Sequence, residues 1–143
     1  NIRKSIGMVF QDYKLLNDRN LFENVALPLH VLGYSNSEIP NRVDEALDLV
    51  GLVGKEMHYP NELSGGEQQR ASLARAIIKE PDLILADEPT GNLDPVASFE
   101  LVRLLETIHE TGTTILMASH NYNLIKGRGR PIYELKDGVL RIR

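Results

Sequence analysis

In the second half of the sequence, two apolar runs flank one amphipathic stretch, and this pattern limits the possible folds more than any other feature. Leu83–Ala86 is continuously apolar, which is typical of a strand that a parallel sheet buries on both faces. Asp94 and Pro95 can cap and begin a helix, and a β-branched apolar run follows at Thr113–Ala118. The apolar stripe predicted for this helix consists of Val96, Phe99, Val102, Leu105 and Ile108. A strand, a helix and a strand in this order predict a right-handed parallel crossover, and therefore an α/β fold.

Apolar patterns elsewhere in the chain predict one more strand, a helical segment and a terminal hairpin. Ser5–Phe10 is a short apolar run with polar neighbours, as expected of a buried strand. The pattern then becomes helical to about residue 80 and includes a predicted helix at Glu67–Lys79. Ile132–Leu135 and Val139–Ile142 flank a Lys-Asp-Gly turn, which predicts a β-hairpin. The helical segment is therefore expected to interrupt a sheet whose strands lie on both sides of it in the sequence.

The start of one helix in this segment can be placed in two ways. Ser37 is a plausible N-cap for a helix that ends near Gly51. Ser35 and Glu38 would form a capping box in an earlier register, but that register puts Pro40 where its missing amide matters. We therefore expect the helix to begin after Ser37.

The composition excludes several classes of protein. The chain has 143 residues, of which 42% are hydrophobic and 25% charged, as in an ordinary globular domain. Its net charge of −4 argues against a nucleic-acid partner bound through bulk charge. The absence of cysteine excludes disulfides and thiolate chemistry. Val25–Tyr34, the longest apolar candidate, falls short of the roughly 18 residues that a membrane span needs.

A serine and two glycines stand before the helix predicted from Glu67. Backbone amides at a helix start are unpaired and glycine leaves them unobstructed, so Ser64, Gly65 and Gly66 could bind an anion. The alternative is that Ser64 and Glu67 form a capping box and that the glycines only make a turn. By itself, the segment leaves both interpretations open.

Two adjacent carboxylates, Asp87 and Glu88, follow the apolar run at Leu83–Ala86. Ligands of open α/β sheets bind at the carboxyl ends of the strands, where these two residues would lie. Consecutive side chains point in different directions, so their roles would differ. Asp87 would hold a hydrated Mg²⁺, and Glu88 would act as a general base toward water. The alternative is a solvated Asp-Glu-Pro turn after a core strand.

Five segments, in this order along the chain, resemble the motifs of the nucleotide-binding domain of an ABC ATPase. Gln11 is similar to the Q-loop glutamine, Leu63–Arg70 to the signature motif and Leu83–Glu88 to the Walker B strand with its catalytic glutamate. Gly91–Asp94 is similar to the D-loop, and His120 to the switch histidine. The resemblance implies a P-loop NTPase fold of the ABC type, which is a mostly parallel sheet with an inserted helical subdomain and a C-terminal hairpin.

The resemblance also implies roles for the residues at these positions, with ATP and Mg²⁺ as cofactors. Glu88, His120 and Gln11 would be the catalytic residues. Asp87 would hold Mg²⁺ together with Gln11. The residues implied to contact the nucleotide are Ser64, Gly65, Gly66, Glu67 and Asp94.

The Walker A motif of the family, Gly-x-x-x-x-Gly-Lys-Ser/Thr, does not occur in the sequence. In the family this loop precedes the Q-loop, and the chain has no initiator Met and no secretory signal, so we expect it to begin inside a longer gene product. The chain would then be one incomplete domain, with a helical subdomain at residues 12–79 and a catalytic core at residues 1–11 and 80–143. Because an upstream strand and helix would cover the sheet near Val9, Leu85 and Leu116, we expect exposed apolar surface there.

Within the family, the residues around the Q-loop, Phe10–Arg19 and Glu23–Leu29, are similar to those of the cell-division ATPases. This likeness implies a homodimer with composite ATP sites, an integral membrane subunit as partner and a place on the inner face of the cell membrane. Alternatives that keep the chemistry are the ATPases of lipoprotein release, peptide export and small-molecule uptake. For the chain without a Walker A loop, the alternative of a different class is a non-hydrolysing interaction module.

Overall fold

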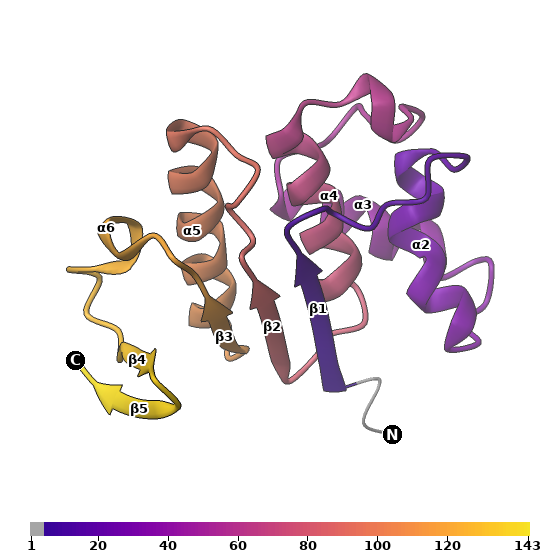
Figure 1. The fold of residues 1–143 in the computed structure, drawn as a ribbon. Coiled ribbons are helices and arrows are strands. Elements are labelled where there is room, and N and C mark those ends of the chain that lie inside the picture. The colour runs from indigo at the N-terminus through magenta and orange to yellow at the C-terminus, as the bar shows by residue number, and fades with distance from the viewer. Residues whose placement is uncertain (1–4) are drawn as a thin grey trace.

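The computed structural model describes residues 5–143, and its centre is a small parallel sheet. Strands β1 (Ile6–Phe10), β2 (Leu83–Asp87) and β3 (Thr114–Ala118) lie side by side in the order β1-β2-β3. All three lie where the sequence predicts strands, to within one residue at either end. Helix α5 (Pro95–Glu110) connects β2 to β3, as Figure 1 shows. The predicted α/β fold with a parallel sheet is confirmed.

The segment between β1 and β2 is helical, as the sequence predicts. It contains α2 (Leu21–Val31), α3 (Ile39–Leu49) and α4 (Gly65–Ile77), with a short 3₁₀ turn, η1 (Pro60–Glu62), before α4. Helix α4 begins and ends two residues earlier than the predicted helix. This helix also packs on β1, so it joins the helical segment to the sheet.

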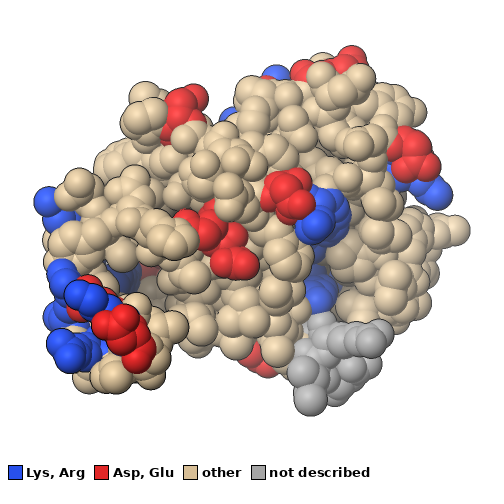
Figure 2. All heavy atoms as spheres, viewed as in Figure 1, with Lys and Arg blue, Asp and Glu red and all other residues tan. Residues whose placement is uncertain are grey.

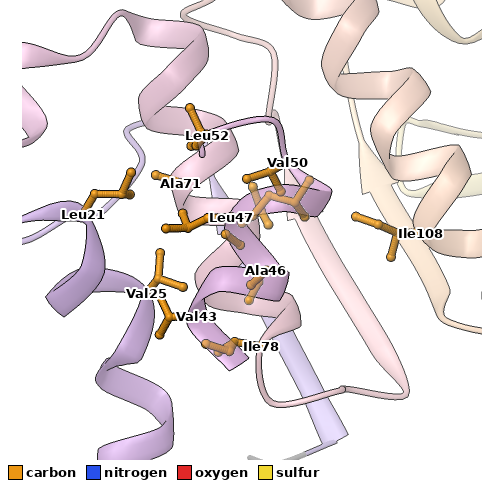
Figure 3. Close-up of a cluster of buried hydrophobic side chains, with 14 of the residues drawn as sticks. Leu21, Val25, Val43, Ala46, Leu47, Val50, Leu52, Ala71, Ile78 and Ile108 are labelled. Atoms are coloured by element: carbon orange, nitrogen blue, oxygen red, sulfur yellow. The ribbon is translucent and has the colours of Figure 1, made fainter. Parts of the chain in front are cut away.

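Apolar side chains of the three helices pack into one buried cluster. Figure 3 shows Leu21 and Val25 on α2, with Val43 and Leu47 of α3 beside them. The cluster continues through α4 to the covered face of the sheet. The side chains with no exposed surface include Val25, Leu29, Val43, Leu47, Leu73 and Ile84. The helical segment therefore has a packed interior of its own that is continuous with the sheet.

Helix α2 is not predicted as a separate helix by the sequence patterns above, although its start carries a clear signal. The Asn20 side chain accepts a hydrogen bond from the amide of Glu23 at 2.8 Å, and the Glu23 carboxylate accepts one from the amide of Asn20 at 2.9 Å. This reciprocal pair is a capping box. The helix also contains Pro28 and apolar residues on more than one side, which weakens its periodic pattern.

Helix α3 begins after Ser37 as predicted, but the prediction that Ser37 is its N-cap is wrong. The N-cap residue is Glu38, and it makes no side-chain capping bond to the helix. The Glu38 carboxylate instead accepts hydrogen bonds from the amide and the hydroxyl of Ser35, at 3.1 and 2.9 Å. Pro40 lies in the first turn of α3, where no helical partner is needed for its missing amide. Pro40 is tolerated because the helix begins late, at Ile39, so the structure agrees with the objection to the earlier register.

Within residues 5–143, only one face of the sheet is covered, which corrects the expectation that Leu83–Ala86 is buried on both faces. Helices α4 and α5 lie behind the strands in Figure 1 and cover the face that carries Val9. The register aligns Met8, Leu85 and Leu116 on the opposite face. Leu116 is 61% exposed and Met8 is also exposed, so apolar surface is present there as predicted. Val9 is buried, however, and does not belong to that open face.

The apolar stripe of α5 is shorter than predicted. Leu105 and Ile108 are buried, whereas Val96 and Phe99 near the start of the helix are exposed. The ring of Phe99 lies under the guanidinium group of Arg128, 5.2 Å from the ring centre. The exposed side of the first turns of α5 therefore contacts the segment after α6.

The C-terminal part consists of a short helix, α6 (Tyr122–Ile125), and a hairpin of β4 (Tyr133–Lys136) and β5 (Val139–Ile142). The predicted hairpin is confirmed, with its first strand one residue later than expected. In the described part of the chain, no residue after Ile108 is buried. None of the helices between residues 5 and 143 is long and apolar enough to cross a membrane.

Candidate active site

The two predicted carboxylates lie at the carboxyl edge of the sheet. Figure 2, viewed as in Figure 1, shows acidic side chains near the ends of the strands. Asp87 is the last residue of β2, and its position in the register is next to Ala118 at the end of β3. The Asp87 side chain is exposed, whereas Glu88 is half-buried. The two consecutive residues are thus in different surroundings, as the sequence suggests.

Glu88 has a backbone conformation that is unusual for a residue with a side chain. Its φ of 46° lies in the left-handed region. The amide of Glu88 donates to the carbonyl of Ala118 at 2.9 Å, and its own carbonyl accepts from Gly91 at 3.0 Å. Such strain costs of order 1–3 kcal/mol and persists only where neighbouring groups hold it, and it is concentrated at functional sites. The backbone therefore sets the direction in which the Cα–Cβ bond of Glu88 leaves the chain.

His120 contacts Glu88 directly. Its Nδ1 directly contacts Oε1 of the Glu88 carboxylate. The His120 side chain is 95% exposed, and that of Glu88 is 21% exposed. This contact follows from the pairing of β2 with β3, because the carboxyl ends of adjacent parallel strands meet at one edge. The structure thus brings together two of the three residues predicted to be catalytic.

Gln11, the third of these residues, is bound to Asn92 in the loop before α5. The Gln11 side-chain amide donates to Oδ1 of Asn92, and the Asn92 amide donates to the carbonyl of Gln11, both at 3.1 Å. The Gln11 side chain also lies so close to Gly91 that a methyl group on Gly91 would meet it at 2.6 Å. Asn92 lies in the D-loop segment, but no sequence pattern pairs it with Gln11, because the two segments are distant in the sequence.

A cleft of about 660 Å³ lies along this edge, and it includes Gln11, Glu88 and His120 among its lining residues. The residues between β2 and α5 and the start of α6 form its other walls. Asp87 is not among the lining residues, and the residues 5–143 contain no cluster of three acidic or histidine side chains that could hold a metal. The Asp87 carboxylate and the Gln11 amide oxygen are nevertheless the hard donors that Mg²⁺ prefers, and Mg²⁺ usually keeps several water or phosphate ligands.

The serine and glycines of the signature segment begin α4 as predicted. Ser64 is the N-cap, and its hydroxyl accepts from the amide of Glu67 at 3.2 Å. The Glu67 carboxylate accepts from the amide of Ser64 at 3.0 Å and also contacts Lys55. The Lys55 ammonium group, followed by the Ser64 amide, lowers the pKa of Glu67 to about 2. The capping box is therefore confirmed, and it leaves the anion-binding interpretation open.

Both glycines of this segment lie close to neighbouring side chains, and neither has a positive φ that a turn would require. A side chain on Gly65 would come within 2.9 Å of the Tyr13 hydroxyl, and one on Gly66 within 3.1 Å of Ala97. A hollow of about 200 Å³ lies beside them, lined by the start of α4 and the segment from Asn92 to Glu100. Asp94 lines this hollow and caps α5 by accepting from the amide of Ala97 at 2.8 Å.

The parallel sheet, the inserted helices and the glutamate-histidine pair define the nucleotide-binding domain of an ABC ATPase, and the comparison with known families agrees. The profile of the ABC transporter family matches residues 1–91. The chain therefore belongs to the ABC transporter family.

Its relatives within the family include several cell division ATP-binding proteins named FtsE. The chain is 49% identical to FtsE of Bacillus subtilis over 139 residues, which cover 97% of the chain and 61% of the relative. It is 50% identical to FtsE of Escherichia coli over 139 residues, which cover 97% of the chain and 63% of the relative. The chain thus spans about 60% of the length of the curated relatives it matches.

A solved structure shares the fold. The chain superposes on cbiO1 of Clostridium perfringens, part of the ABC transporter complex cbiONQ, with a TM-score of 0.78 and 33% sequence identity. The superposition covers 86% of the chain and 50% of cbiO1. This agreement confirms the ABC-type fold that the sequence motifs imply.

Proposed function

We propose that the protein is an ATP-binding and ATP-hydrolysing subunit of the FtsE type, acting in bacterial cell division with an FtsX-like membrane partner. The observation that carries the proposal is the contact between Glu88 and His120 at the carboxyl edge of the sheet, with Gln11 on the same cleft. The identity of about 50% to FtsE proteins over nearly all of the chain supports the cell-division role.

In the proposed reaction, the strained backbone of Glu88 directs its carboxylate to accept a proton from the attacking water. His120 holds this carboxylate through Nδ1, which leaves Nε2 to face the substrate: in the neutral ring Nε2 accepts from the attacking water, and only in the doubly protonated ring does it donate to a phosphate oxygen. Asp87 and Gln11 would hold Mg²⁺, which would neutralise the charge that develops on the phosphates. For Gln11 to take this role, its side-chain amide has to exchange Asn92 for the metal or its water.

We further propose that two copies of the protein assemble around two ATP molecules. Ser64, Gly65, Gly66 and Glu67 of one copy would close on the nucleotide held by the other, with Asp94 across the interface. The hollow that Ser64, Gly65 and Gly66 share with Asp94 supports a common surface. The helical subdomain at residues 12–79 would transmit the motion to the membrane partner, and the protein would lie on the cytoplasmic face of the cell membrane.

A second candidate function applies to the chain of 143 residues by itself. Its sequence contains no Walker A motif, so neither its lysine nor its amide cradle is available to hold the β- and γ-phosphates. We propose that the chain alone is a non-hydrolysing module. Titration of ATP and Mg²⁺ into the chain is expected to show no tight binding, and saturation at micromolar ATP would contradict this.

Steady-state ATP hydrolysis by the full-length protein carrying Glu88→Gln tests the main proposal. Loss of the general base is expected to lower kcat by about 10²–10⁴-fold, because the glutamine cannot accept the proton. Glu110→Gln makes the same chemical change at an exposed position at the end of α5 and is the matched control. Hydrolysis retained in Glu88→Gln would remove Glu88 from the role of base.

A further inference from the structure

Gln69 on α4 is a polar side chain without exposed surface that none of the roles above uses. Its side-chain amide donates to the carbonyl of Phe10 at 2.9 Å and also to the carbonyl of Pro89. The Gln69 oxygen, Oε1, is buried and has no hydrogen-bond partner in the described part of the chain. One amide nitrogen thus bonds two carbonyl groups from different segments of the chain.

These two carbonyls stand next to the proposed catalytic residues. Phe10 is the last residue of β1 and immediately precedes Gln11, and Pro89 immediately follows Glu88. Because a peptide group is planar, a bond to the carbonyl of Phe10 also orients the amide of Gln11. The bond to Pro89 fixes the chain on the C-terminal side of Glu88, whose amide is held by Ala118 on the other side.

The chemistry of the site allows only one orientation of the Gln69 amide. If the amide were turned over, its oxygen would face two carbonyl oxygens, and both would lose their donor. The observed orientation leaves Oε1 unpaired in the core, near the equally unpaired hydroxyl of Ser72 one turn along α4. An unpaired buried acceptor is destabilising. A polar side chain at this position is therefore explained by its two donated bonds rather than by packing.

We propose that Gln69 is a positioning residue for the proposed hydrolysis. It holds the segments of Gln11 and Glu88 in a fixed relation to each other and to α4, the helix that begins with the signature segment. The inference rests on the proposed function, because it assigns Gln69 a part in that reaction. A displacement of α4 would thereby shift both catalytic segments together.

A second residue of α4 supports this link. Arg75 donates to the carbonyls of Lys14 and Tyr13 at 2.7 and 3.1 Å. Tyr13 and Lys14 both have positive φ, a conformation that ordinary side chains rarely adopt. Helix α4 therefore bonds the chain both before Gln11, at Phe10, and after it, at Tyr13 and Lys14.

The test compares Gln69→Met with Ser72→Ala in the full-length protein. Methionine keeps the approximate length of the side chain and removes both donors, whereas Ser72→Ala removes a buried hydroxyl that makes no hydrogen bond within residues 5–143. We expect kcat for ATP hydrolysis to fall by about 10- to 100-fold in Gln69→Met, because small displacements of catalytic groups have effects of this size. KM for ATP in Gln69→Met, and both kcat and KM in Ser72→Ala, are expected to stay within about twofold of wild type. A Gln69→Met enzyme with unchanged kcat, or with a loss confined to KM, would overturn the inference.

A measurement on the wild-type protein keeps the inference testable if Gln69→Met does not fold. In an isotope-labelled sample, both side-chain amide protons of Gln69 should exchange slowly with solvent and show coupling to the carbonyl carbons of Phe10 and Pro89. Fast exchange without coupling would overturn the inference independently of activity. A wild-type protein that hydrolyses no ATP would instead contradict the proposed function, so the two failures are distinguishable.

Discussion

The helical segment before β2 and the segment after Ile108 differ in burial: the first is packed around buried side chains, and the second has none in the described chain. Side chains of α2, α3 and α4 have no exposed surface at several positions, and α4 bonds the chain on either side of Gln11. After Ile108, the described chain has no buried residue, and His120 projects from it with an exposed ring. One side of the candidate site is therefore set by packing. The other side is set by strand pairing, by the contact of His120 with Glu88, and by the contacts of Arg128 with Phe99 and Glu106 on α5.

The largest effect that this comparison predicts is a difference in stability between two leucine substitutions. Leu47→Ala in α3 removes a side chain without exposed surface, so it should lower the free energy of unfolding by about 2–5 kcal/mol. Leu140→Ala in the exposed hairpin should change it by less than about 0.5 kcal/mol. Urea unfolding of the chain measures both values. Equal losses would show that the hairpin is as tightly packed as the helices.

The fold was predictable from the sequence where one periodic pattern determines the structure. The strands and helices α4 and α5 follow from apolar runs and caps, so their positions are right to within about two residues. The open face of the sheet was predictable only in part, because the register that sets which side chains face it depends on tertiary pairing. The sequence alone therefore does not distinguish Val9, which is buried, from Met8, which lies on the open face.

In the candidate site, too, contacts between segments that are distant in the sequence were not predictable from local patterns. The contact of Glu88 with His120 was predictable, because adjacent parallel strands bring their carboxyl ends together. The partners Asn92 and Gln69 were not, because they reach Gln11 and Phe10 across 81 and 59 positions of sequence. No local pattern marks an amide that finds its partner at such a distance. For Gln69, the one signal is a glutamine on the buried face of α4, and that face is identified only after the packing of the helix is known.

A smaller effect is expected where α4 approaches the sheet. A methyl group on Gly7 would lie 2.9 Å from the backbone carbonyl oxygen of Ala76, which cannot easily move. Gly7→Ala should therefore destabilise the chain by about 1–3 kcal/mol. Leu116→Ala, on the open face, is the matched change on the same sheet and should cost less, because Leu116 is largely exposed. Thermal unfolding of the two variants provides the comparison, and a larger loss for Leu116→Ala would mean that the open face is covered.

The smallest expected effect concerns the pH dependence of the packed side, at the start of α4. The folded-state pKa of Glu67 is lowered to about 2, below its ordinary value of 4.5, so the folded chain binds fewer protons than the unfolded chain in this interval. The stability that Glu67 contributes should be fully present above about pH 4.5 and should disappear as the pH falls to about 2.

Other carboxylates titrate in the same range, so the useful quantity is the difference in unfolding free energy between wild type and Glu67→Gln. Glutamine can still close the capping box but does not attract Lys55 as a carboxylate does, so this difference isolates the charge. We expect the difference to be constant from neutral pH to about pH 5 and to vanish near pH 2; a difference that does not change with pH would mean that Lys55 does not hold Glu67 in solution.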